Sequence, residues 1–148
     1  MFAGEFRCKL DEKGRFFIPS SIRELFDKGK PSPTTSVIFV RGQTECLWLY
    51  SFADWEQKLS RAKETLDDDQ SRLFMHFIVS ETTSSEIDRS GRICVPRRLR
   101  ELSGIEDEIV VIGMYDRMEI WSTEEWSSYL ARMEEKYETS LNKILNVL

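Results

Sequence analysis

Two short motifs of the form Asp-x-x-Gly-Arg carry the most distinctive chemistry of this 148-residue chain, at residues 11–15 and 88–92. Glycine allows the positive φ that a tight turn requires, so Gly14 and Gly91 are expected to shape the two turns. The fork of an arginine suits both phosphate oxygens and guanine edges, so Arg15 and Arg92 are candidate contacts to nucleic acid.

Further basic side chains surround both motifs. Alternation along an extended strand puts Arg7 and Lys9 on one face. Residues 88–100 hold five arginines against one aspartate, although the whole chain has a net charge of −5. Local charge matters more than total charge for attracting an anion. The candidate DNA-binding residues are Arg7, Lys9, Lys13, Arg15, Arg89, Arg92, Arg97 and Arg98.

Ion pairing within the chain is the competing interpretation of these residues. Arg15 and Arg92 each follow an aspartate by four residues and are equally well explained as its partner. No local acid is evident for Lys13, Arg97 or Arg98, which favours an external partner for them.

A tandem repeat organises the chain. Residues 10–25 align without a gap with residues 87–102 at an offset of 77, and Trp55 aligns with Trp126 at an offset of 71. Such a match predicts a duplicated unit of roughly 70–75 residues. We expect a first repeat at residues 1–66, a bridging helix at 67–80, a second repeat at 81–126 and a C-terminal helix at 127–148.

Each repeat is expected to form four short strands and a closing helix. After the turn come strands at 15–18 and 92–95, a short helix, and strands at 37–40, 46–50, 109–112 and 118–121. Ser51 and Ser122 would cap the closing helices, and one of the three aspartates 67–69 would cap the bridging helix. One such unit has too little core and too many sheet edges to be stable alone. The expected fold is therefore mostly β with α (α+β), with both repeats closing one pseudo-dimeric barrel.

Other chemistry is poorly supported by the sequence. His76 is the single histidine, and the three cysteines are widely spaced without a CxxC motif, so no metal site and no cofactor are expected. No apolar run is long enough to span a membrane. An enzyme that uses Asp11 and Asp88 as paired carboxylates is a weak alternative, and no small-molecule substrate is expected.

The chain resembles the MraZ family in its opening Met-Phe-x-Gly-Glu, in both Asp-x-x-Gly-Arg blocks with the following Ile18-Pro19 and Val95-Pro96, and in the 46–50 and 119–121 runs. The resemblance implies two AbrB-like swapped-hairpin repeats. It also implies a cytoplasmic, nucleoid-associated regulator of the division and cell-wall gene cluster. Arg15 and Arg92 would contact DNA, and Asp11 and Asp88 would shape the turns together with Gly14 and Gly91. Arg89-Ser90 departs from the family pattern in the second motif.

The resemblance further implies a homo-oligomeric ring that binds direct repeats in a promoter. Affinity depends on the number of phosphates neutralised, so repeating a weak basic surface around a ring adds avidity. The long C-terminal helix is the candidate ring contact. The runner-up function is a non-enzymatic scaffold or protein-interaction module in which the arginines pair internally.

Overall fold

The computed structural model describes residues 1–27, 34–43 and 45–148 of the chain. Each repeat contributes four strands. Those of the first are β1 (Glu5–Lys9), β2 (Arg15–Phe17), β3 (Thr35–Arg41) and β4 (Cys46–Ser51). Those of the second are β5 (Thr83–Ile87), β6 (Arg92–Cys94), β7 (Glu108–Gly113) and β8 (Met118–Ser122). The helices are α1 (Ser20–Asp27), α2 (Phe52–Thr65), α3 (Asp68–Phe77), the 3-10 turn η1 (Val79–Glu81), α4 (Arg97–Leu102) and α5 (Thr123–Leu145).

The two repeats exchange strands. Six strands form one antiparallel sheet in the order β1-β7-β8-β4-β3-β5, and β2 pairs with β6 in a separate two-stranded ribbon. The first strand of each repeat therefore pairs with the other repeat, β1 on β7 and β5 on β3. The strand order is unchanged when the repeats are exchanged, so the expected swapped, pseudo-dimeric α+β arrangement is confirmed.

One apolar core lies between the sheet and the ribbon. Phe16 and Ile93, the central residues of β2 and β6, are each 1% exposed and belong to the same cluster as Phe39, Leu49 and Ile120 of the sheet. Alternation puts every second side chain of these strands into that cluster. Both repeats therefore build a single hydrophobic core, which neither set of four short strands would bury alone.

Two equivalent helices cover the outer face of the sheet. The Ser51 hydroxyl accepts a 3.1 Å hydrogen bond from the backbone N–H of Asp54 at the start of α2, and Ser122 does the same for Glu125 at the start of α5. Trp55 of α2 is buried against the outer side of the sheet. Both expected serine caps are thus confirmed.

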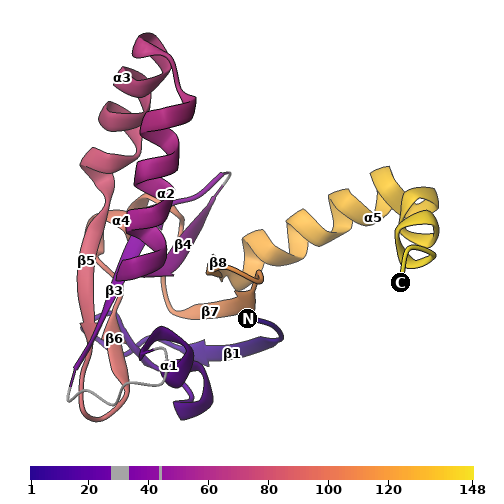
Figure 1. The fold of residues 1–148 in the computed structure, drawn as a ribbon. Helices are drawn as coiled ribbons and strands as arrows, with labels where there is room; N and C mark the ends of the chain where they lie inside the picture. Colours follow the sequence, from indigo (N-terminus) through magenta and orange to yellow (C-terminus); the bar gives the residue numbers. More distant parts are fainter. Residues whose placement is uncertain (28–33, 44) are drawn as a thin grey trace.

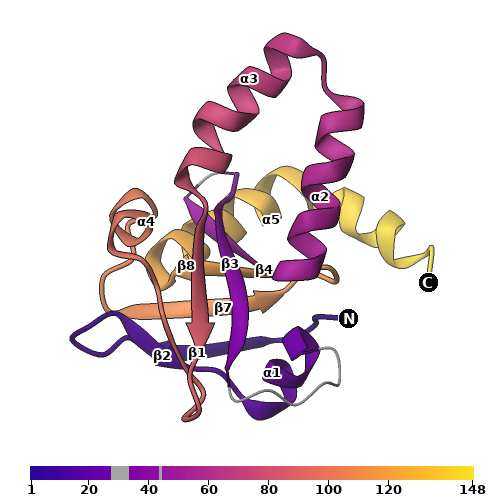
Figure 2. The ribbon, with the colours of Figure 1, turned by 60° about the vertical axis from the view of Figure 1, so that its left-hand side comes forward.

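Beyond these caps the two helical extensions differ. α2 ends at Thr65, and α3 returns beside it to form a helical hairpin that projects from the sheet, whereas α5 continues as one long helix away from it (Figures 1 and 2). Asp67 accepts from the Gln70 backbone N–H, and the Gln70 side chain accepts from the Asp67 N–H, so the expected aspartate cap of the bridging helix is confirmed. α5 bends at Tyr137, whose φ of −124° and ψ of 19° are not helical.

Candidate nucleic-acid interface

The β2–β6 ribbon brings the two motif arginines together on one surface. Arg15 pairs with Cys94, Phe16 with Ile93, and Phe17 with Arg92. The central pair points into the core, so the two outer pairs share the opposite face of the ribbon. We call that surface the ribbon face; it consists of Arg15, Phe17, Arg92 and Cys94.

Each turn that precedes the ribbon is held by its aspartate. Asp11 Oδ1 accepts hydrogen bonds of 2.9 Å from the backbone N–H groups of both Lys13 and Arg15. The Gly14 N–H donates to the Asp11 carbonyl at 3.0 Å, and Gly14 has a φ of 79°. The second turn repeats this geometry around Asp88, with a φ of 84° at Gly91.

The two turns are also tied to each other's strands. The Val95 N–H donates to the Gly14 carbonyl at 2.9 Å, and the Ile18 N–H donates to the Gly91 carbonyl at 2.8 Å. The turns lie at opposite ends of the ribbon, one after β1 and the other after β5 (Figure 2). The position of each turn is therefore fixed by the opposite repeat.

Both arginines pair with the aspartate of their own turn. Arg15 Nε lies 2.7 Å from Asp11 Oδ2, and Arg92 Nε lies 3.1 Å from Asp88 Oδ2. The ion pairs that the sequence left open are therefore present. Each uses only the Nε side of the guanidinium, so within the described part of the chain these aspartates orient the fork without engaging its terminal nitrogens. An arginine held in this way is prepared for a planar, two-pronged acceptor.

The surroundings of the aspartates oppose the enzyme alternative. The backbone N–H of Arg15 is the largest influence that lowers the pKa of Asp11, and hydrogen bonds from the Arg15 side chain and the Lys13 N–H add to it. Asp88 has a lowered pKa for the same reasons, with the Arg92 N–H first. A pair of catalytic carboxylates would need at least one raised pKa and no such partners.

The arginines of α4 have local partners that the sequence analysis missed. Arg98 donates from Nε and a terminal nitrogen to the two carboxylate oxygens of Glu81, each at 2.8 Å, and Arg97 Nε lies 3.1 Å from Glu101. The expectation that neither arginine has a nearby acid was therefore wrong. Glu81 lies seventeen residues away in sequence, and only the folded chain brings it next to Arg98.

The remaining basic candidates lie around the ribbon rather than on its face. Arg7 and Lys9 are exposed on the outer side of β1, as predicted, and lie near Glu5 at 3.3 Å and Glu108 at 3.8 Å respectively. Lys13 lies in the first turn and Arg89 in the second.

Arg100 is a further basic residue of the site. A Cβ built on Gly14 would lie 2.6 Å from the Arg100 Cζ, so the guanidinium packs directly over the first turn. Gly14 is therefore required by its positive φ, whereas the flexible end of the Arg100 side chain can shift to make room for a Cβ. The residue aligned with Arg100 in the first repeat is Arg23, and that match was the available sequence signal.

Metal binding finds no support in the described ranges, where no three His, Cys, Asp or Glu side chains lie close enough together to hold an ion. His76 is exposed on α3. None of the helices, within residues 1–27, 34–43 and 45–148, has the length and apolarity needed to cross a membrane.

Comparison with known proteins gives the family. The model of the family described as "MraZ protein, putative antitoxin-like" matches the chain twice, at residues 1–77 and 78–145. The chain belongs to the MraZ family. Among MraZ relatives, proteins named "Transcriptional regulator MraZ" from Desulforamulus reducens and Halothermothrix orenii are both 38% identical to it. The first alignment covers 100% of both chains, and the second covers 93% of this chain and 92% of the relative. A third protein named "Transcriptional regulator MraZ", from Moorella thermoacetica, is 35% identical, and the alignment covers 99% of this chain and 98% of the relative.

Proposed function

We propose that this MraZ-family protein is a sequence-specific DNA-binding transcriptional regulator that places the ribbon face in the major groove. One observation carries the proposal: Arg15 and Arg92, from opposite repeats, lie diagonally on the same face of a two-stranded ribbon. Their side chains are 30% and 33% exposed, and each fork is oriented by an aspartate. The major groove, about 12 Å wide, admits such a ribbon, and an arginine fork there binds guanine O6 and N7. The name of the relatives, transcriptional regulator, agrees with this function.

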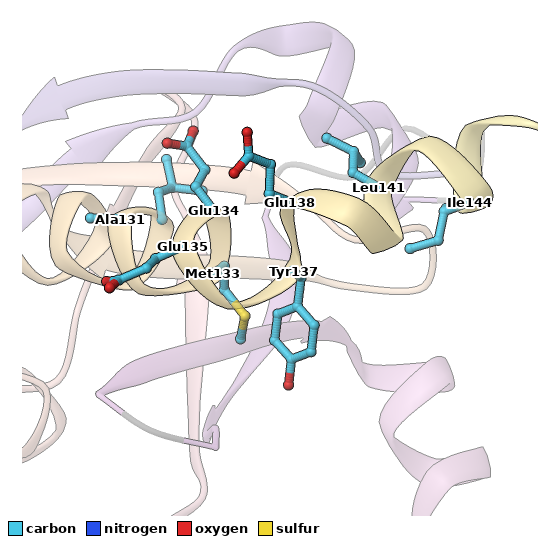
Figure 3. A pocket seen from close by; sticks show the side chains of 9 residues that line it. Ala131, Met133, Glu134, Glu135, Tyr137, Glu138, Leu141 and Ile144 are labelled. Atoms are coloured by element: carbon cyan, nitrogen blue, oxygen red, sulfur yellow. The ribbon is translucent and has the colours of Figure 1, made fainter.

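The proposal extends to assembly, since one ribbon contacts few phosphates. α5 has a hollow of about 900 Å³ at its bend (Figure 3). Its lining is mostly apolar, with Leu130, Tyr137, Leu141 and Ile144 among others, and also includes Glu134, Glu135 and Glu138. On the other helical arm, α3 exposes Leu73, which is 58% accessible. A contact between two different surfaces is heterologous, and it closes into a ring when the rotation between subunits allows it. We therefore propose that α5 of one copy packs against α3 of the next copy.

A ring would bind several sites at once. Each ribbon face would occupy one of a series of repeated promoter sequences, and the linked sites would bind with avidity. The proposed target is the promoter of the division and cell-wall gene cluster, with repression as the outcome because a ring over the promoter blocks access. The acidic remainder of each subunit would limit non-specific binding to DNA.

The ribbon face carries a natural chemical probe for this function. Cys94 is the exposed one of the three cysteines and lies directly opposite Arg15, whereas Cys46 is buried. Saturating promoter DNA should slow alkylation of Cys94 by iodoacetamide. Free glutathione in the same reaction should serve as the control, because burial raises the pKa of the Cys8 thiol to about 11 and makes that cysteine unreactive. Equal alkylation of Cys94 with and without bound DNA would exclude the ribbon face as the DNA surface.

A scaffold is the second candidate function, favoured by the ion pairs of Arg97 and Arg98 within the chain. It predicts assembly through α5 without DNA binding. A salt-dependent gel shift separates the two functions, because phosphate contacts weaken steeply with salt and a protein scaffold shows no shift at all.

A further inference from the structure

The ribbon face contains an aromatic side chain that the fold leaves unused. Phe17 is 64% exposed, whereas the adjacent Phe16 is 1% exposed in the core. In the register of the ribbon Phe17 is directly opposite Arg92, and Arg15 lies two residues before it on the same face. A large apolar ring is thus presented to the solvent between two oriented arginines.

We propose that Phe17 reads thymine through the C5-methyl group, next to a guanine bound by Arg92; this inference rests on the proposed DNA-binding function. In the major groove the thymine methyl is the one apolar group that distinguishes the four bases, and phenylalanine is a suitable contact for it. Phosphate binding alone would call for polar or basic side chains at this position. The exposed ring beside Arg92 therefore points to base recognition.

The residue equivalent to Phe17 in the second repeat is not aromatic, which makes the ribbon face asymmetric. Cys94 aligns with Phe17 at the offset of 77, although both turns and both arginines match between the repeats. One outer pair of the ribbon is consequently Arg15 with Cys94, and the other is Phe17 with Arg92. A symmetric face would read a palindrome. A face with the aromatic ring at one end favours one orientation on each site, which is what a series of direct repeats requires.

Replacing thymine with uracil tests this contact, because the change removes the methyl group and keeps the hydrogen-bonding pattern. The probe is the promoter fragment upstream of the protein's own gene, amplified with either dTTP or dUTP. Wild-type protein should bind the thymine fragment more tightly by about fourfold for each buried methyl group. The wild-type comparison requires no variant and is unaffected by folding.

The Phe17→Ser variant identifies the side chain responsible. It should bind the thymine fragment as weakly as wild type binds the uracil fragment, and it should bind the two fragments equally. The matched control is Phe52→Ser, which removes another exposed phenylalanine, 51% accessible at the start of α2. This control should keep the wild-type preference for thymine.

Two results would overturn the inference: equal binding of both fragments by wild type, or an unchanged thymine preference in Phe17→Ser. The proposed function fails separately, through absence of binding to either fragment by assembled wild type at low salt. Loss of binding in Arg15→Ala together with wild-type behaviour in Phe17→Ser would keep DNA binding and remove the role of the aromatic ring.

Discussion

Trp48 and Glu119 occupy equivalent positions of the two repeats, 71 residues apart, and meet each other across the pseudo-twofold axis. They face each other in the register of β4 and β8, and the Trp48 Nε1 donates a 3.0 Å hydrogen bond to Glu119 Oε2. With two identical repeats, this position would meet a copy of itself. Two tryptophans would lack an acceptor, and two buried glutamates would repel. The duplicated chain has a complementary pair at that position instead.

The cluster around this pair adds further contacts. Glu119, 9% exposed, also accepts a 3.1 Å hydrogen bond from Trp121 Nε1, and the Arg117 guanidinium lies 4.6 Å from the centre of the Trp48 ring. The carboxylate therefore serves two indoles at the centre of the sheet. It makes the arrangement of the two repeats depend on a contact that only unlike residues can form.

Replacing Glu119 should destabilise the fold. Glu119→Leu leaves two indole N–H groups without their acceptor, at a cost of about 2–4 kcal/mol in the free energy of unfolding. Glu119→Gln keeps one acceptor oxygen, so its free energy of unfolding should fall by about half as much. Urea denaturation measures both, with Glu124→Gln as the control at an exposed position nearby. A loss below about 1 kcal/mol in the leucine variant would show that the cluster is not important for stability.

The neighbouring carboxylates of Glu45 and Glu125 should lower the stability of the fold near neutral pH. A hydrogen bond with the Glu45 side chain is the main cause of the raised pKa of Glu125, and burial adds to it. A carboxyl whose pKa is higher in the folded state contributes stability at low pH, and this is lost as the pH rises through the raised pKa. Glu125→Gln should therefore melt at a higher temperature than wild type at pH 7, with the difference vanishing near pH 4. Glu64→Gln, at an exposed position of α2, is the control, and an unchanged melting temperature at pH 7 in Glu125→Gln would contradict the prediction.

The turn aspartates should affect stability in the opposite direction. Because the pKa of both Asp11 and Asp88 is lowered by folding, their contribution is present above the ordinary aspartate value of 3.8 and is lost as the pH falls through the lowered value. Asp11→Asn combined with Asp88→Asn should be less stable than wild type from pH 5 to 8. Thermal melts should show the two proteins converging below about pH 4. A difference that persists unchanged to pH 2 would show that ionisation of these groups is irrelevant.

Charge on the apolar side of α5 should break the assembly. Ile144 is 62% exposed, and Ile144→Asp would place a carboxylate in the proposed contact between copies. Light scattering should show a fall in mass to that of smaller species, while the melting temperature of the subunit stays near that of wild type. Thr139→Asp is the control, because it adds the same charge at an exposed polar position of the helix. A wild-type mass in Ile144→Asp would remove this part of α5 from the interface.

Much of the fold could be predicted from the duplication. The offset of 77 predicted equivalent turns, the strands after them and a shared core, and the serines at 51 and 122 marked the starts of the covering helices. Strand exchange followed from the family resemblance. The bend at Tyr137 gave no sequence signal, because the apolar spacing of α5 continues across it.

The details of the site were less predictable, since they depend on residues brought together by folding. The pairing of Arg98 with Glu81 and the packing of Arg100 on Gly14 join segments far apart in sequence. Phe17 was expected only as part of a short strand. Its position on the outer face became evident from the register of β2 with β6, which places the neighbouring Phe16 in the core.

Fluorescence anisotropy with the promoter fragment from upstream of the protein's own gene tests the central claim, that Arg15 and Arg92 on the ribbon face bind DNA. Wild type should bind with a steep salt dependence and should prefer the promoter over random DNA. Arg15→Ala and Arg92→Ala should each lose about 1–3 kcal/mol of that preference while keeping the assembled mass. Absence of binding by assembled wild type below physiological salt, or full preference in both variants, would contradict the claim.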